Sequence, residues 1–189
     1  MSETAAPSPD SSPLRIANFR AYWFSRLSMT LAQYAMMLII GWQTYNIARD
    51  GGMGVGAASG QLALIGLLQF VPLFLLTPFS GWAADHFDRR NIARLTVLAQ
   101  LGCAATLAWL TTSNNLTLPT LFSVAVVLGI VRAFNGPALS ALAPNLVPKT
   151  ILPNAIALSS IAWQVGMIVG PAIGGYTYAI FPALPYFVA

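Results

Sequence analysis

Arg132 is the residue of this chain whose position most directly suggests chemistry. It lies about 14 residues into the apolar run 118–142, which is about 20 Å along a helix. A guanidinium at such a depth in an apolar medium costs about 2.5–3.5 kcal/mol, so it usually faces a protein interior or a water-filled cavity. Asn135 follows on the same side of the helix, and Gly136 comes next. These three residues are predicted to line a cavity in which Arg132 is a substrate-linked or proton-linked cation. The alternative is that its long side chain only reaches back to the nearer polar interface.

A second group of candidate residues fills the short polar gap between the apolar runs 61–84 and 92–112. Asp85 ends the first of the two helices, where the helix dipole disfavours a carboxylate by about 0.3–1 kcal/mol. A positive partner is therefore expected, and a partner that moves away would make Asp85 a conformational latch. The alternative is a solvated loop whose arginines only fix orientation. The candidate residues of this gap are Gly81, Asp85, Asp88, Arg89 and Arg90.

A third feature is a run of glycines around one proline inside the apolar segment 155–180. An interior glycine costs a soluble helix about 1 kcal/mol and a proline about 3 kcal/mol, whereas in a membrane neighbouring helices satisfy the freed backbone groups. Gly166, Gly170 and Gly174, here called the glycine stripe, lie four residues apart and so share one flat face. That face predicts the close approach of another helix. Pro171 predicts a bend, and Gly175 completes the run.

The composition places these features in a membrane protein. Of the 189 residues, 57% are hydrophobic and 7% are charged, whereas soluble domains are about 25% charged. Residues 1–14 are rich in Ser and Pro and are predicted to be a disordered cytoplasmic tail. Five apolar segments reach the length of about 20 residues that a spanning helix needs. They are 21–48, 61–84, 92–112, 118–142 and 155–180, and a sixth begins at 182 and continues to 189.

The positive charges predict the orientation in the lipid bilayer. They precede the first apolar segment and follow the second and the fourth, whereas the alternate gaps contain at most one cation. By the positive-inside rule, the N-terminus and these two gaps are cytoplasmic. The net charge of +4 does not predict nucleic-acid binding, because the cations are not clustered on one polar face. The cations concerned are Arg15, Arg20, Arg89, Arg90, Arg94 and Lys149.

The residue types argue against an enzyme. One His and one Cys cannot form a zinc site, and no Asp or Glu lies within an apolar segment, so neither a metal nor a cofactor is predicted. For the same reason no carboxylate that could carry a proton is located. Arg26, near the start of the first segment, is expected to reach the interface. Polar side chains that could face a cavity, or else only bond between helices, are Gln33, Gln43, Asn46, Gln69 and Gln164.

Together these motifs resemble the N-terminal half of a major facilitator superfamily transporter. The polar gap is similar to the family's loop signature Gly-x-x-x-Asp-[Arg/Lys]-x-Gly-x-[Arg/Lys]-[Arg/Lys], from which His86, Asp88 and Asn91 depart. The run that begins at Arg132 resembles the fourth-span signature Arg-x-x-Gln-Gly, with Asn135 in place of Gln. Residues 166–175 match the fifth-span signature Gly-x-x-x-Gly-Pro-x-x-Gly-Gly at every fixed position, and this signature is typical of exporters.

The resemblance implies an all-α, N-terminal six-helix half of the major facilitator fold, with five spans complete and the sixth truncated. It implies a proton-coupled exporter, an antiporter in the cell (plasma or inner) membrane, for a small amphiphilic molecule such as a drug or siderophore. The branch it resembles is that of enterobactin-like and macrolide-like exporters. Asp85 and Arg90 would form the gate, Arg132 would couple to protons, and the helix of the glycine stripe would bend as the halves rock. A missing C-terminal half would complete the substrate site. The alternative is a non-transporting, truncated or regulatory membrane half that pairs with another chain.

Overall fold

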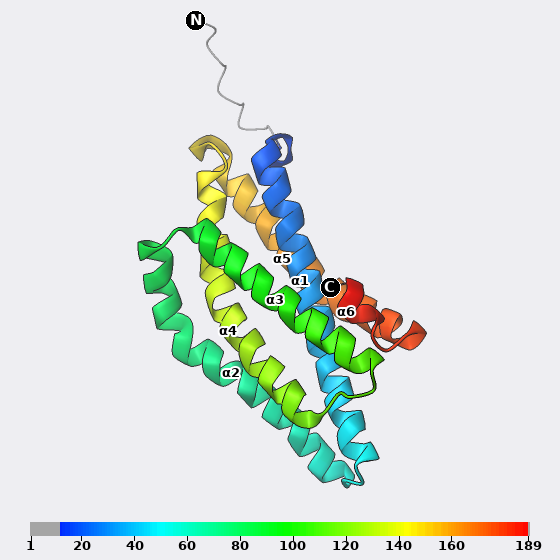
Figure 1. Ribbon diagram of the computed structural model, residues 1–189. Coiled ribbons are helices and arrows are strands. Elements are labelled where there is room, and N and C mark those ends of the chain that lie inside the picture. The colour runs from blue at the N-terminus through cyan, green and yellow to red at the C-terminus, as the bar shows by residue number, and fades with distance from the viewer. Residues whose placement is uncertain (1–11, 189) are drawn as a thin grey trace, which may run out of the picture.

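The computed structural model describes residues 12–188, and within that range every side chain except those of 84, 89, 137, 138, 140, 141 and 143. The described chain is a bundle of helices without a strand, which confirms the predicted all-α fold (Figure 1). Its long helices are α1 (Ala17–Asp50), α2 (Val55–His86), α3 (Arg89–Thr112), α4 (Leu118–Leu142) and α5 (Leu152–Ile180). Shorter elements are α6 (Leu184–Val188) and the 3₁₀ turns η1 (Pro13–Arg15), η2 (Ala143–Asn145) and η3 (Lys149–Ile151).

The long helices contain all five predicted apolar segments, and most of them extend further into the flanking polar residues. The sixth predicted segment forms the short helix α6, and its last residue, 189, lies outside the described residues. Most of the predicted tail, 1–11, also lies outside them. Regular structure begins at Pro13, slightly before the predicted end of the tail at residue 14, because the η1 turn packs against the start of the bundle.

Within residues 12–188, four helices are long and apolar enough to cross a membrane by length and composition: α2, α3, α4 and α5. Helix α1 has 34 residues but does not reach the same hydropathy, because polar side chains such as Arg26, Gln33 and Gln43 interrupt it. These polar side chains are half-buried or buried within the bundle. The crossing of the membrane by 21–48 therefore stays a prediction.

Helices distant in sequence lie side by side. Helix α1 packs along α5, α2 packs along α4, and α3 also contacts α4. Successive long helices alternate in direction. As a result the start of α1, the α2–α3 turn and the α4–α5 connection all lie toward the upper part of Figure 1. The backbone positions of the cations used to predict the orientation are thereby gathered toward one end of the bundle.

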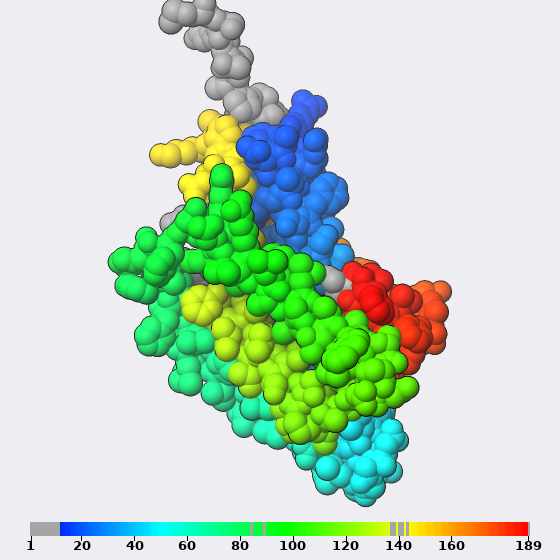
Figure 2. Space-filling view, in the orientation of Figure 1, coloured from blue at the N-terminus to red at the C-terminus, as the bar shows by residue number. Residues whose placement is uncertain are grey.

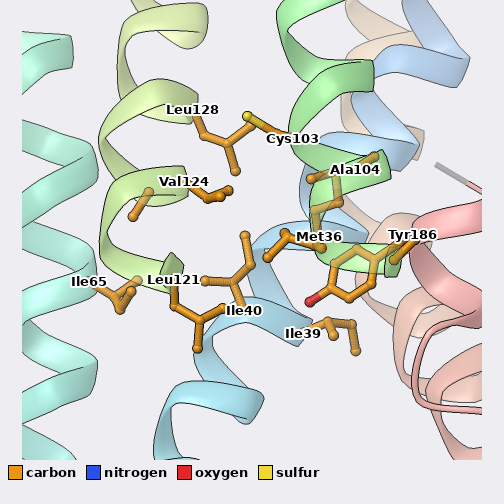
Figure 3. Packing of buried hydrophobic residues seen from close by; sticks show 13 residues of the cluster. Met36, Ile39, Ile40, Ile65, Cys103, Ala104, Leu121, Val124, Leu128 and Tyr186 are labelled. Atoms are coloured by element: carbon orange, nitrogen blue, oxygen red, sulfur yellow. The ribbon is translucent and has the colours of Figure 1, made fainter. Parts of the chain in front are cut away.

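The main core lies between α1, α3, α4 and α6, with Ile65 of α2 at its edge (Figure 3). Adjacent turns of α1 direct Met36, Ile39 and Ile40 inward, and each of these side chains is at most 1% exposed. They meet small residues of α3 and branched residues of α4, so the helices approach closely. The partners that Figure 3 labels are Ile65, Cys103, Ala104, Leu121, Val124, Leu128 and Tyr186.

The outer surface of the bundle is strongly apolar. Helices α2 and α3 lie along the face that Figure 2 shows, and large side chains of α2 point outward. Phe74 is 64% exposed and Phe79 is 61% exposed. Contiguous apolar surface of this kind marks contact with lipid or with another protein. It agrees with a multi-pass protein that is embedded in a membrane.

A buried polar chain attaches α6 to the bundle. The Tyr186 hydroxyl donates to Gln43 Oε1 over 2.5 Å, and Gln43 Nε2 donates to Thr111 Oγ1 over 3.3 Å. These contacts join α6, α1 and α3. The Gln43 amide therefore bonds between helices, as one of the two sequence interpretations expected.

Replacing Tyr186 by Phe should destabilise the folded bundle by about 1–3 kcal/mol, because Gln43 Oε1 would stay buried without its donor. Thermal unfolding of the full-length protein in detergent measures this loss. Tyr176→Phe is the matched control, since Tyr176 is 73% exposed. An equal change in both variants would contradict a specific role for the buried chain.

Candidate functional site

The glycine stripe brings α5 against the backbone of α1. All three glycines of the stripe are buried. A Cβ at Gly170 would lie 2.8 Å from the carbonyl oxygen of Leu31, and one at Gly174 would lie 2.9 Å from Ala35 Cα. Because no side chain fits there, α1 and α5 form a tightly packed pair that positions one wall of the site. Gly175 is different, since a Cβ there would meet only Leu38 Cδ2, at 3.7 Å.

A second close crossing, between α2 and α4, was not predicted. A Cβ at Gly129 would lie 3.1 Å from both Gln69 C and Gln69 Cα, so the backbones of the two helices are in contact. Gln69 is 6% exposed and is held at this crossing. The feature of the sequence that could have predicted this crossing is one isolated glycine, Gly129, in an apolar run. Isolated glycines are too common in spanning helices to indicate a helix contact by themselves.

A polar cavity of about 230 Å³ lies between α1 and α4, with single residues of α2 and α5 in its wall. Among the predicted site residues, it brings together Arg132, Asn135, Gly136 and Gln33. The first three come from adjacent turns of α4, and Gln33 faces them from α1. The remaining lining residues are Arg26, Thr30, Tyr34, Leu73, Leu139 and Trp163. We refer to this space below as the arginine cavity.

Arg26 lines the arginine cavity. From the sequence it was instead expected to reach the polar interface. Its Nη1 donates to the Tyr22 hydroxyl over 2.9 Å, and that hydroxyl donates to the carbonyl oxygen of Leu139 over 3.0 Å. Tyr22 is buried, so this contact holds the guanidinium against α4. The helical spacing of Arg26, Thr30 and Gln33 could have indicated a shared polar face.

Two buried polar atoms of the arginine cavity have no hydrogen-bond partner among the described residues. They are Arg26 Nε, a donor, and Asn135 Oδ1, an acceptor. Asn135 is only 7% exposed. Buried polar groups are normally paired, and an unpaired one calls for an explanation such as a ligand.

Two glutamines that the sequence offered as cavity residues lie elsewhere. Gln69 occupies the α2–α4 crossing, and Gln164 is exposed on α5. Neither of them lines the arginine cavity. The residue of α5 that faces it is Trp163, the neighbour of Gln164. A shift of one residue rotates a side chain by about 100° around a helix, which hydropathy alone does not resolve.

Asp88, one of the residues that depart from the family's loop signature, has a structural role in the α2–α3 turn. The Asp88 side chain caps α3, and its Oδ1 accepts a hydrogen bond from Arg90 N over 2.8 Å. A carboxylate is a preferred N-cap and complements the helix dipole. Asp88 is thus accounted for by local structure.

The other turn residues are distributed over two surfaces. Asp85 is exposed in the last turn of α2, and Gly81 is exposed, with no atom from outside its own helix within 4 Å of the position of a Cβ. Arg90, together with Arg94, faces a groove between α1, α3 and α4. The side chain of Arg89 lies outside the described residues. The described contacts therefore do not bring Asp85 to the arginine cavity.

An apolar groove of about 620 Å³ lies beside the arginine cavity. Tyr34 lines both spaces, and Pro171 of α5 lies in the groove wall. No pattern in the sequence predicted this groove, since its residues come from three helices. Its lining residues are Tyr34, Met37, Leu38, Gly41, Trp42, Tyr45, Leu62 and Pro171.

Comparison with known proteins identifies the family of this chain. The family described as transmembrane secretion effector matches residues 8–189. The staphyloferrin A transporter of Staphylococcus aureus is 28% identical over 129 residues, which are 68% of this chain and 32% of that protein. Macrolide efflux protein A of Streptococcus pyogenes is 28% identical over 120 residues, 64% of this chain and 30% of that protein. The probable transport protein HsrA of Haemophilus influenzae is 34% identical over 120 residues, 61% of this chain and 24% of that protein.

These alignments cover only a part of each relative. The chain spans between 24% and 32% of the length of these three curated proteins. The match to the family, in contrast, extends over almost the whole chain. The chain belongs to the transmembrane secretion effector family of the major facilitator superfamily.

Proposed function

We propose that this chain is the N-terminal half of a secondary active exporter in the cell membrane. The exporter moves a small amphiphilic molecule out of the cell and is driven by the proton gradient. Support comes from family membership and from relatives that are named for macrolide efflux and for staphyloferrin A transport. No relative named here supports the alternative of a non-transporting regulatory half.

The observation that carries the proposal is the arginine cavity. It gathers Arg132 and Asn135 from α4 with Arg26 and Gln33 from α1, within helices whose outer surfaces are apolar. Ionisable residues inside a membrane are costly and mark substrate or ion pathways. Sites of secondary transporters lie near the middle of the bilayer, between two structural repeats. A second half of the protein would close this cavity and form the other wall.

The tight α1–α5 pair supports the proposed movement. Its glycine contacts leave no room for independent rotation of the two helices, so they would move as one body. In an alternating-access cycle this body would rock against the second half around the bound substrate. We infer that the N-terminus and the α2–α3 turn face the cytoplasm, since their cations gather toward one end of the bundle.

Transport by the full-length protein in sealed vesicles with an imposed pH gradient tests the function. A panel of drugs and siderophores should include a compound that moves with the gradient and stops when a protonophore collapses it. Equal transport with and without the gradient would contradict proton coupling. Purification of the chain with a different partner chain, with no transport of any compound, would favour the regulatory alternative.

The proposed gate predicts an effect of Asp85→Asn. If Asp85 pairs with a positive group of the second half, its neutralisation should slow transport by about tenfold, which corresponds to about 1.4 kcal/mol. Initial rates at equal amounts of reconstituted protein measure this. Asp50→Asn is the matched control, because Asp50 is also an exposed acid in the last turn of a helix. Equal rates for the two variants would remove Asp85 from the gate.

A further inference from the structure

We propose that the exported molecule is an amphiphilic carboxylate whose anionic head binds in the arginine cavity, while its apolar body lies along the adjoining groove. This inference rests on the proposed export function and specifies its substrate class. It assigns a specific role to Arg26, which the proposed export function includes only as part of the wall of the arginine cavity.

The first argument is charge. Two of the residues that line the arginine cavity are arginines, Arg26 and Arg132, and the described lining contains neither Asp nor Glu. The other polar lining residues are neutral. Two guanidinium groups that share a partly buried space repel each other and lose hydration, unless an anion lies between them. Arginine presents a planar fork of donors that matches a carboxylate.

The second argument is the pair of unsatisfied polar atoms. Arg26 Nη1 is already bonded to Tyr22, while Arg26 Nε is buried with a free hydrogen. A carboxylate oxygen would accept that hydrogen. Asn135 Oδ1 needs a donor, which a hydroxyl or N–H group next to the carboxylate would supply. A bound molecule with both features would satisfy both atoms.

The third argument is shape. The arginine cavity, at about 230 Å³, is smaller than the roughly 300–1,000 Å³ of sites for drug-sized ligands. It therefore suits a head group rather than a whole molecule. Tyr34 connects it with the groove of about 620 Å³, where aromatic and aliphatic side chains such as Met37, Trp42 and Leu62 offer an apolar surface. A charged head with an apolar body fits the two spaces together.

A carboxylate side chain from the second half of the protein could occupy the same position. Binding measurements on the purified full-length protein in lipid nanodiscs distinguish this source from a bound ligand. The probes are 1-naphthaleneacetate, the neutral 1-naphthaleneacetamide and the cationic 2-(1-naphthyl)ethylamine, which share one apolar ring system. At neutral pH the acetate should bind about tenfold or more tightly than the amide, since hydrogen bonds to charged groups contribute on that scale.

Variants of Arg26 test whether this residue recognises the negative charge of the acetate. Arg26→Gln should remove the preference for the acetate over the amide. Arg26→Lys keeps the positive charge and should retain a preference for the acetate over the amide. Retained binding in this variant would show that a substitution at position 26 does not by itself prevent folding. Arg49→Gln, at the exposed end of α1, is the matched control and should bind as the unmodified protein does.

Two outcomes would overturn the inference. One is equal or tighter binding of the amide or the amine by the unmodified protein, as expected if a protein carboxylate already neutralises the arginines. The other is an acetate preference that survives Arg26→Gln. In the first case, export of neutral or cationic compounds would still leave the export function standing. An Arg26-dependent preference for the acetate without any transport would support the carboxylate site and contradict the export function.

Discussion

Arg132→Ala is expected to abolish proton-driven efflux by the full-length protein while its amount in the membrane stays unchanged. Arg132 lines the arginine cavity on α4 and is half-buried, so it is not needed to fill the main core. Its removal deletes a cation for which neutral neighbours such as Gln33 cannot substitute. Loss of hydrogen bonds to a charged group costs about 1.5–3 kcal/mol each, so two such bonds are enough to lower the rate by about a hundredfold or more.

A second measurement separates the two roles that Arg132 could have. Exchange of labelled substrate across vesicles without a pH gradient does not require net proton movement. Exchange that persists in Arg132→Ala would assign the residue to proton coupling, and loss of exchange would assign it to substrate binding. Arg20→Ala, which removes an exposed arginine of α1, is the matched control. Unchanged proton-driven efflux in Arg132→Ala would refute a role in either step.

Gly170→Leu is expected to prevent assembly of the α1–α5 pair. Even a Cβ at this position would lie 2.8 Å from the carbonyl oxygen of Leu31 and 3.0 Å from Tyr34 Cβ. Backbone cannot move aside as a flexible side chain can, so the helices must separate. Overpacking typically costs about 1–3 kcal/mol, and the displacement of Tyr34 would also disturb both the arginine cavity and the groove.

The yield of monodisperse protein and its efflux rate should both fall in Gly170→Leu, and Gly170→Ala should show the same effect to a smaller extent. Gly175→Ala is a stringent control, because it lies on the same helix and its Cβ would meet only Leu38 Cδ2 at 3.7 Å. That variant should keep its yield and its activity. If Gly170→Ala and Gly175→Ala behaved alike, the packing of the glycine stripe against α1 would not be important for assembly.

Some of the structural features on which these predictions rest can be predicted from the sequence alone. The five long helices, their approximate ends and the flat glycine face follow from local properties, namely hydropathy over about 20 residues and the helical period. A deep arginine is also visible without a structure, because its cost depends on the apolar run around it. The capping role of Asp88 is also a local property, but it was not predicted. Comparison with the family's loop signature marked Asp88 only as a departure from that signature.

Tertiary structure alone decided which surfaces meet. It showed that α1 is the helix against the glycine stripe, that Arg26 shares a cavity with Arg132, and that Gln164 does not. Such contacts join residues more than a hundred positions apart in the chain and depend on the rotation of each helix about its axis. Hydropathy resolves that rotation poorly in a membrane protein, because lipid and protein interior are both apolar. Helix pairing was instead set by shape, through backbone contact at the glycines and through the polar groups that could find partners only between helices.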